Sequence, residues 1–195
     1  MTDTLTLRPS RPDDLPALNA VLWATYDSTW KPQLTADKHA QFCASGKTAQ
    51  YVQSRGHLFW VAECDGVVAG FVDWVDDFIG ALHVLPAWQG RGVGRALLAH
   101  AEQALRAAGH AQVRLETDSF NTQALGFYTA QGYAKALWNC QQYKRPSPIQ
   151  CMRVQPPLAT APAAMPTPTD AKAGAPAILT GIRRKAEQAP AAARP

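Results

Sequence analysis

No stretch of this 195-residue chain reaches the run of about 18 uninterrupted apolar residues that a membrane-spanning helix needs. The opening segment, MTDTLTLRPSRPDD, also lacks the basic region and apolar run of a secretory signal peptide. These two absences predict a cytoplasmic protein that does not bind a membrane.

Cysteine is scarce, with four residues in the chain, and no two of them form a Cys-x-x-Cys pair. Such pairs are the usual mark of structural zinc sites and redox dithiols. We therefore expect reduced thiols that behave as small, mostly buried hydrophobic side chains, and we expect no metal site.

The first 154 residues have almost no excess of either charge, since they carry 14 Lys and Arg against 13 Asp and Glu. Residues 155–195 hold five basic and two acidic side chains, are rich in proline and alanine, and contain no aromatic residue. Such a segment cannot build a core. The sequence predicts a folded domain over 1–154 and a disordered basic tail over 155–195, and it argues against a nucleic-acid partner.

The first 154 residues alternate between the periods of strands and helices. Asp65-Gly66 separates two β-rich runs and is a strong hairpin signal. We predict strands at Thr4–Arg8, His57–Cys64, Val67–Val75, Phe78–Leu85, Val113–Thr117, Tyr133–Trp138 and Gln150–Val154, and helices at about 11–22, 35–54, 93–108 and 121–131. This order describes a mixed sheet with helices on its faces, of the α/β (α+β) class.

The most informative local feature is a glycine-punctuated turn, Gln89-Gly-Arg-Gly-Val-Gly-Arg95, which joins a predicted strand to a helix. Its three glycines let backbone N–H groups converge beside the positive end of a helix dipole, and its two arginines add charge. The segment lacks the Gly-Lys-Ser/Thr end of a P-loop and the G-x-G-x-x-G spacing of a dinucleotide fingerprint. We therefore predict an anion site of another kind, suited to a phosphate or pyrophosphate.

This turn resembles a signature of the GNAT superfamily of acyl-CoA N-acyltransferases, Gln/Arg-x-x-Gly-x-Gly/Ala, which here reads Gln89-Gly-Arg-Gly92-Val-Gly94. Val84-Leu-Pro86 precedes it, as Val-x-Pro does in many members. A second signature appears as Asn121-Thr-Gln-Ala124-Leu-Gly-Phe127-Tyr128-Thr-Ala-Gln-Gly132-Tyr133. The two motifs stand in the family's order, and the likeness is clearest from Leu58 to Ala134.

The resemblance implies the GNAT fold, a central and mostly antiparallel sheet of six or seven strands with about four helices, splayed between the fourth and fifth strands. It also implies acetyl-CoA as co-substrate and no metal. The pyrophosphate would lie on the backbone of the turn, the pantetheine arm in the splay, and the Val84 N–H near the thioester carbonyl, which it would polarise. The residues implied in cofactor binding are Leu82, His83, Val84, Gln89, Gly90, Arg91, Gly92, Val93, Gly94, Arg95 and Asn121.

The resemblance also implies catalytic residues. Family members often use a tyrosine on the helix after the last core strand to protonate the leaving sulfur, and Tyr128 holds that place. Glu116 holds the place of the glutamate that takes the amine proton in the branch that acetylates protein N-termini. Asp76, Asp77 and His83 acting through water, or bulk water itself, are alternative proton acceptors, and the choice stays open at this point.

The acceptor amine is expected to meet aromatic side chains of the N-terminal helices and the hairpin, with Asp73, Asp76 and Asp77 attracting its charge. These aromatic residues are Trp23, Tyr26, Trp30, Trp74 and Trp88. The function implied is transfer of acetyl from acetyl-CoA to a primary amine of a small molecule or peptide, by direct attack in a ternary complex. A non-catalytic acyl-CoA-binding sensor or partner-binding module is the alternative, and a homodimer is compatible with either.

Overall fold

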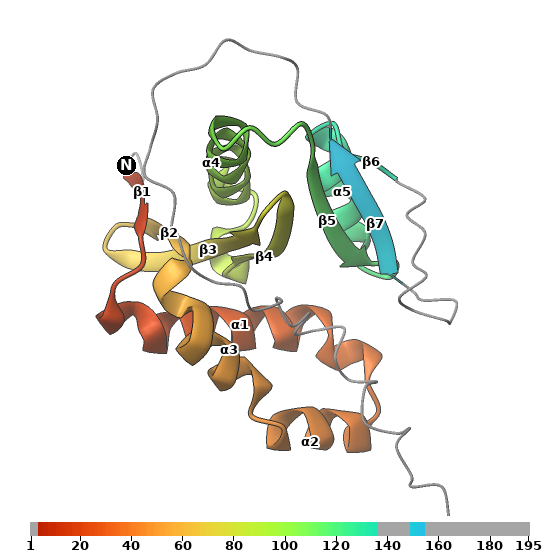
Figure 1. Cartoon of the computed structure of the whole chain (residues 1–195). Helices are drawn as coiled ribbons and strands as arrows, with labels where there is room; N and C mark the ends of the chain where they lie inside the picture. The colour runs from red at the N-terminus through yellow and green to blue at the C-terminus, as the bar shows by residue number, and fades with distance from the viewer. Residues whose placement is uncertain (1–3, 136–148, 155–195) are drawn as a thin grey trace, which may run out of the picture.

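The computed structural model describes residues 4–135 and 149–154, and Figure 1 shows how its elements are arranged. The strands are β1 (Leu5–Pro9), β2 (Trp60–Cys64), β3 (Val67–Val75), β4 (Phe78–Val84), β5 (Val113–Asp118), β6 (Ala134–Lys135) and β7 (Ile149–Val154). The α-helices are α1 (Leu15–Thr29), α2 (Ala36–Ala44), α3 (Lys47–Arg55), α4 (Val93–Ala107) and α5 (Thr122–Ala130). The predicted tail over 155–195 and the predicted strand residues 136–138 lie outside the described residues.

The strands form one seven-stranded mixed sheet in the order β1-β2-β3-β4-β5-β7-β6. Neighbouring strands are antiparallel except β4 and β5, which run parallel. The predicted hairpin turn joins β2 to β3, with φ of 50° at Asp65 and 79° at Gly66. The fold class expected from the sequence is therefore confirmed.

The parallel pair β4 and β5 is joined at two positions only, Phe78 with Arg114 and Ile79 with Leu115. Beyond these positions the two strands diverge, and Figure 1 shows β5 and β7 turned away from the rest of the sheet. The expected splay between the fourth and fifth strands is thus present. Within the described part of the chain, the edge of β4 that faces β5 has no strand beside it after Ile79.

Helices cover both faces of the sheet. Side chains of α1 and α3 pack on one face in a buried cluster that includes Leu18, Phe59 and Phe71. Side chains of α4 and α5 pack on the other face, where Leu97 and Leu115 are at most 2% exposed. Burial of this kind is the main stabilising term of such a domain. The splay is the place where this covered sheet opens.

The predicted single helix over 35–54 is two helices in the structure. Gly46 has a φ of +62°, a left-handed conformation that separates α2 from α3. The described residues therefore contain five α-helices rather than four. Helix α1 is also longer than expected, because it continues to Thr29 and has Trp30 as its C-cap.

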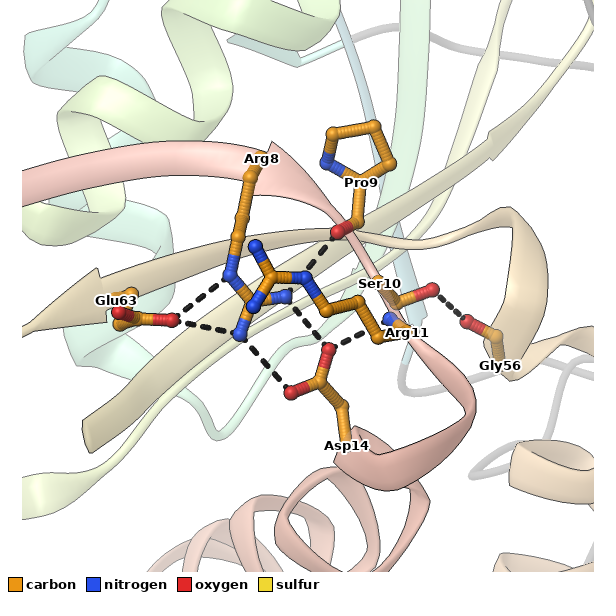
Figure 2. A network of polar contacts seen from close by, with 7 residues as sticks. All are labelled: Arg8, Pro9, Ser10, Arg11, Asp14, Gly56 and Glu63. Carbon is orange, nitrogen blue, oxygen red and sulfur yellow. Dashed lines mark hydrogen bonds and ion pairs between the residues drawn. The ribbon is translucent and has the colours of Figure 1, made fainter. Parts of the chain in front are cut away.

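A cluster of charges ties the start of α1 to the edge of the sheet (Figure 2). The Arg8 guanidinium donates to both carboxylate oxygens of Asp14, at 2.7 and 3.0 Å, and to Glu63 at 2.7 Å. Asp14 also accepts a hydrogen bond from the backbone N–H of Arg11 at 2.6 Å. The hydrogen bonds from Arg8 lower the pKa of Asp14. Arg8 thereby joins β1, β2 and the turn that opens α1.

Replacing Arg8 with methionine should lower the free energy of unfolding at pH 7 by about 2 kcal/mol, because the mostly buried Asp14 carboxylate loses its guanidinium partner. The pKa of Asp14 is lower in the folded than in the unfolded chain, so this stabilisation is lost as the pH falls below about 4. Denaturant titrations at pH 7 and pH 3 should show the gap between wild type and Arg8→Met shrinking at low pH. An equal gap at both would mean that Arg8 acts through the packing of its stem alone.

Candidate active site

The glycine turn between β4 and α4 adopts a backbone conformation that its glycines permit. Gly90 and Gly92 have φ of +73° and +87°, values that strain residues with a side chain. Gly92 is the N-cap of α4 and offers no capping side chain, so the first N–H groups of the helix are available to a ligand. At Gly94 a Cβ would lie 3.6 Å from Phe127, an ordinary contact, so neither space nor backbone demands glycine there.

A cavity of about 340 Å³ lies beside this turn. It is bounded by the free edge of β4, the start of α4, helix α5 and the C-terminal end of α1. Its lining residues are Thr25, Thr29, Trp30, Leu82, His83, Val84, Gln89, Gly90, Gly92, Gly94, Arg95, Asn121, Gln123, Ala124, Phe127, Tyr128, Ala130 and Gln131. The cavity thus joins the glycine turn, which the sequence predicts, to the splay, which the resemblance implies.

All the predicted site residues line this cavity except Arg91, Val93 and Glu116. Val93 is the first residue of α4, with its side chain buried in the core, and the Arg91 guanidinium lies over the Trp88 ring, 5.1 Å from its centroid. Glu116 is on β5, next to the buried Leu115 and therefore on the opposite face of that strand. The roles proposed for Arg91 and Val93 use their backbone, so they do not require a lining side chain.

The N–H groups of Leu82 and Val84 point into the splay. Leu85 N–H donates to the Ala69 carbonyl of β3 at 2.8 Å, and alternate residues of a strand direct their N–H groups to opposite sides. The N–H groups at 82 and 84 therefore point away from β3. The Val84 carbonyl lies on this side too, where it accepts a hydrogen bond from Gln89 Nε2 at 3.0 Å. Two backbone donors thus face the cavity.

Polar side chains brace the turn against α5. Gln89, besides bonding to β4, accepts a hydrogen bond at Oε1 from Gln123 Nε2 at 2.8 Å. Asn121 is the N-cap of α5, and its Oδ1 accepts from the Ala124 N–H at 3.1 Å. Sequence reasoning missed Gln123, because a glutamine inside a helical motif carries no signal of its own.

Tyr128 lies on α5 and is 8% exposed where it lines the cavity. Its ring packs between those of Phe127 and Tyr133, with centroids 5.1 and 5.5 Å away. Burial raises the pKa of Tyr128 well above its usual value. The hydroxyl therefore keeps its proton throughout the neutral and mildly alkaline range, as a proton donor must.

His83 also lines the cavity and is 8% exposed. Its Nδ1 lies 2.9 Å from Thr25 Oγ1, and the same hydroxyl lies 3.1 and 3.0 Å from the carbonyls of Val21 and Leu22. A threonine hydroxyl has one proton, which goes to a helix carbonyl, so Thr25 accepts from the Nδ1–H of His83. This assignment leaves Nε2 with the lone pair. Burial lowers the pKa of His83 to about 4, so the ring is neutral at physiological pH.

The predicted acidic wall of the acceptor pocket is wrong. Asp73 is 2% exposed and accepts from Arg55 at 2.6 Å and from the Tyr51 hydroxyl at 2.7 Å. Asp77 is paired with Arg114 and accepts from Gln112 Nε2 at 3.2 Å. Asp76 stands in the turn between β3 and β4 with a φ of 51° and does not line the cavity. Two of the three carboxylates hold the scaffold together instead.

Of the five aromatic residues expected in that pocket, only Trp30 lines the cavity. Trp23 and Tyr26 pack on Phe42 of α2, with ring centroids 5.8 and 4.2 Å away. Trp74 lies beside His100 of α4, and Trp88 lies under the Arg91 guanidinium. The rings of these residues pack against neighbouring side chains of the domain and do not line the cavity.

Trp30 makes a hydrogen bond to Asp118 that could not be predicted from the sequence. Its indole Nε1 donates to Asp118 Oδ2 at 2.7 Å, which connects the end of α1 to the end of β5 across 88 positions of sequence. Burial raises the pKa of Asp118, and the indole hydrogen bond opposes this change. A carboxylate is therefore held beside a residue of the cavity wall.

Other classes of site find little support in the described residues. Over residues 4–135 and 149–154, no group of three or more His, Cys, Asp or Glu is arranged to hold a metal ion. None of the helices seen there is long and apolar enough to cross a membrane. Cys64 is buried as expected, whereas Cys43 is exposed.

Comparison with protein families gives a match to the model described as Acetyltransferase (GNAT) family, over residues 15–133. This span covers more than half of the chain and includes the glycine turn and α5. The chain belongs to the GNAT acetyltransferase family. The resemblance noted from the two sequence motifs is thereby confirmed.

One protein of similar sequence and two solved structures of similar fold are also acetyltransferases by name. This GNAT chain is 30% identical over 128 residues to the peptidyl-lysine N-acetyltransferase YiaC of Escherichia coli strain K12, a match covering 65% of this chain and 82% of the relative. The PaiA N-acetyltransferase of Thermoplasma acidophilum, solved with coenzyme A, superposes with a TM-score of 0.65 at 18% identity, covering 78% of this chain and 99% of that one. The ribosomal-protein-S18-alanine N-acetyltransferase of Escherichia coli gives 0.57 at 20% identity, covering 83% and 100%.

The buried, neutral His83 should make the stability of this GNAT domain depend on pH. Because its pKa is about 4 when folded and about 6.5 when unfolded, the unfolded chain binds the extra proton between these values, and stability falls as the pH drops through them. Between pH 7 and pH 4, wild type should lose up to about 3 kcal/mol more than His83→Gln. Urea titrations measure the difference, with the exposed His57→Gln as control. Parallel losses in wild type and His83→Gln would contradict a neutral, buried His83.

Proposed function

We propose that the chain transfers the acetyl group of acetyl-CoA to a primary amine of a small molecule or peptide, by direct attack in a ternary complex. One observation carries this proposal: the free edge of β4 and the glycine turn line one cavity, which continues to the end of α1. The names of the relatives support it, since YiaC is a peptidyl-lysine N-acetyltransferase and the Thermoplasma structure contains coenzyme A.

In this proposal the cofactor runs along the splay. The pyrophosphate lies on the N–H groups from Gln89 to Arg95, where the uncapped start of α4 and the Arg95 side chain favour an anion. The pantetheine arm pairs with the edge of β4 from Leu82 to Val84. Its amides then satisfy backbone donors that otherwise face the cavity without a strand partner.

The chemistry needs a polarised thioester and two proton transfers. The amine nitrogen attacks the thioester carbon, with the Val84 N–H stabilising the oxyanion that forms. A base takes one proton from that nitrogen as the N–C bond forms. The C–S bond then breaks, and Tyr128 gives its proton to the departing sulfur.

For the base we keep Glu116 in first place and His83 as its rival. Glu116 shares its face of β5 with Asp118, the residue that contacts Trp30 at the acceptor end. His83 lines the cavity with Nε2 free of its proton, but its lowered pKa makes it a weak base. We no longer propose Asp77 as the base, because its carboxylate is paired with Arg114 and accepts a hydrogen bond from Gln112.

Placing a negative charge in the turn should abolish cofactor binding. Gly92→Asp should weaken acetyl-CoA binding more than a hundred-fold, because its carboxylate competes for the N–H groups that receive the pyrophosphate and repels it. Gly92→Asn is the matched control, since it imposes the same backbone strain without the charge and should keep measurable binding. Calorimetry on both folded variants decides the matter, and equal affinities for the two would contradict a pyrophosphate at this turn.

Thiol release with Nα-acetyl-lysine amide as acceptor separates the enzyme from the alternative. Wild type that binds acetyl-CoA and acetylates none of a panel of amines and peptides would behave as a non-catalytic acyl-CoA-binding module. Wild type that fails to bind acetyl-CoA would overturn both.

Tyr128→Phe should lower kcat about ten- to a hundred-fold and leave acetyl-CoA affinity unchanged, because only a proton transfer in the transition state is lost. Tyr133→Phe is the control, because Tyr133 is also buried but its hydroxyl bonds to Glu102 at 3.0 Å, away from the cavity lining. A wild-type kcat for Tyr128→Phe would contradict the proton-donor role and would leave Tyr128 a packing function only.

The same steady-state assay separates the two candidate bases. If Glu116 takes the amine proton, the defect of Glu116→Gln shrinks at high pH, where more of the amine is already neutral. His83→Gln should then show no such recovery. The reverse pattern would transfer the role to His83.

A further inference from the structure

Asp118 contacts the wall of the cavity at the end of α1, the end that the proposed reaction leaves for the acceptor amine. It is the last residue of β5, and its carbonyl accepts from the Asn121 N–H at 3.0 Å in the turn that leads to α5. Its Oδ2 accepts from Trp30 Nε1 at 2.7 Å, and Trp30 lines the cavity together with Thr25, Thr29 and His83 at the end of α1. The backbone contact fixes the end of β5, and the indole hydrogen bond holds the carboxylate against a residue of the cavity wall.

The cavity wall itself leaves the acceptor end without charge. Arg95 is the one charged residue among the lining side chains, and it belongs to the glycine turn at the opposite end. Thr25, Thr29 and Trp30 are neutral, and so is His83, since burial lowers its pKa to about 4. Asp118 is therefore an acidic residue that a hydrogen bond joins directly to the wall of the cavity at this end.

Half of the Asp118 carboxylate is available to a ligand. The indole hydrogen bond occupies Oδ2, and within residues 4–135 and 149–154 the structure shows no hydrogen bond to Oδ1. An ionised carboxylate has about four lone-pair sites, so one neutral N–H leaves most of its capacity unused. The partly buried setting strengthens any charge-assisted bond that the remaining oxygen forms.

We infer that Asp118, positioned by Trp30, binds the ammonium group of the acceptor before it is deprotonated, and so selects cationic primary amines that carry no carboxylate beside the nitrogen. This inference rests on the proposed function. The Oδ1 atom accepts an N–H of the ammonium, and the Trp30 ring offers its face to the same cation. A carboxylate on the neighbouring carbon would be repelled by Asp118 and would find no cation on the lining residues at that end. The chemistry that fits is that of a lysine side chain in a peptide, or of a simple aliphatic amine.

The Trp30 to Asp118 bond also has a purely structural interpretation, as a clasp between α1 and β5. Asp118→Asn separates the two, because the asparagine oxygen still accepts from the indole while the charge is gone. A clasp alone predicts an Asp118→Asn protein that resembles wild type. Recognition of an ammonium predicts a defect confined to the acceptor, since the substitution changes only the Asp118 side chain, which bonds to Trp30 and, among the described residues, to none of those assigned to the cofactor.

The test uses two measurements on wild type and Asp118→Asn, with Asp13→Asn, an exposed acidic residue of the turn before α1, as control. In steady-state kinetics, Asp118→Asn should raise KM for Nα-acetyl-lysine amide about ten-fold or more, with kcat and KM for acetyl-CoA unchanged. The preference of wild type for alanine amide over free alanine should also shrink in Asp118→Asn, because the repulsion of the carboxylate is lost. An unchanged amine KM and an unchanged preference would overturn the inference.

The second measurement does not depend on turnover. Calorimetric titration with butylammonium, in the presence of coenzyme A, should give a dissociation constant about ten-fold weaker for Asp118→Asn than for wild type. Equal constants, or no binding to wild type, would overturn the inference. Should wild type bind the ammonium through Asp118 yet acetylate no amine, the proposed function would fail while the ammonium site stands.

Discussion

The parting of β4 from β5 after Ile79 is the constraint on which the whole site depends. Backbone N–H and C=O groups in the middle of a sheet need partners, and β4 has a strand on only one side beyond that point. A register shift between β3 and β4 leaves Gly80 unpaired at the place where the strands diverge, and such bulges bend the strand that carries them. The free donors at Leu82 and Val84 follow from this bend, and an extended ligand with amide groups is the natural partner for them.

Ion pairs and hydrogen bonds within the scaffold hold Asp73 and Asp77 away from the cavity, which no Asp or Glu of the described residues lines. Asp73 is hydrogen-bonded to Arg55 and Tyr51, and these contacts join α3 to β3. Asp77 forms an ion pair with Arg114 at the base of the splay. Arg95 is then the charged side chain that lines the cavity, and Asp118 is hydrogen-bonded to Trp30 of the cavity wall. Under the proposed function, this separation of charge would draw an anionic cofactor and a cationic acceptor to opposite ends of the cavity.

Much of this arrangement could be predicted from local sequence. The hairpin at Asp65-Gly66 and the amphipathic α4 were predictable because turn chemistry and helical periodicity are local signals. The glycine turn was predictable because positive φ at Gly90 and Gly92 needs a particular residue type. The break at Gly46 was missed, since one glycine in a polar helical segment is compatible with either a continuous or a divided helix.

The acceptor end was the least predictable part, because its contacts join residues distant in sequence. Aromatic residues of the N-terminal helices and the hairpin, together with nearby aspartates, predicted a pocket for a cationic amine, but packing and ion pairs decide which of them face a cavity. The Trp30 to Asp118 bond spans 88 positions, and the tautomer of His83 depends on Thr25, 58 positions away. Neither pairing leaves a trace in local pattern, so only the folded chain reveals them.

The most direct test of the account is an amide chemical-shift map of the ¹⁵N-labelled protein titrated with coenzyme A. If the cofactor runs along the edge of β4 into the start of α4, the largest changes will fall on the N–H groups of Leu82, Val84, Gly90 and Gly92. A map whose changes avoid these residues, or that gathers at the β1 edge of the sheet, would contradict the account.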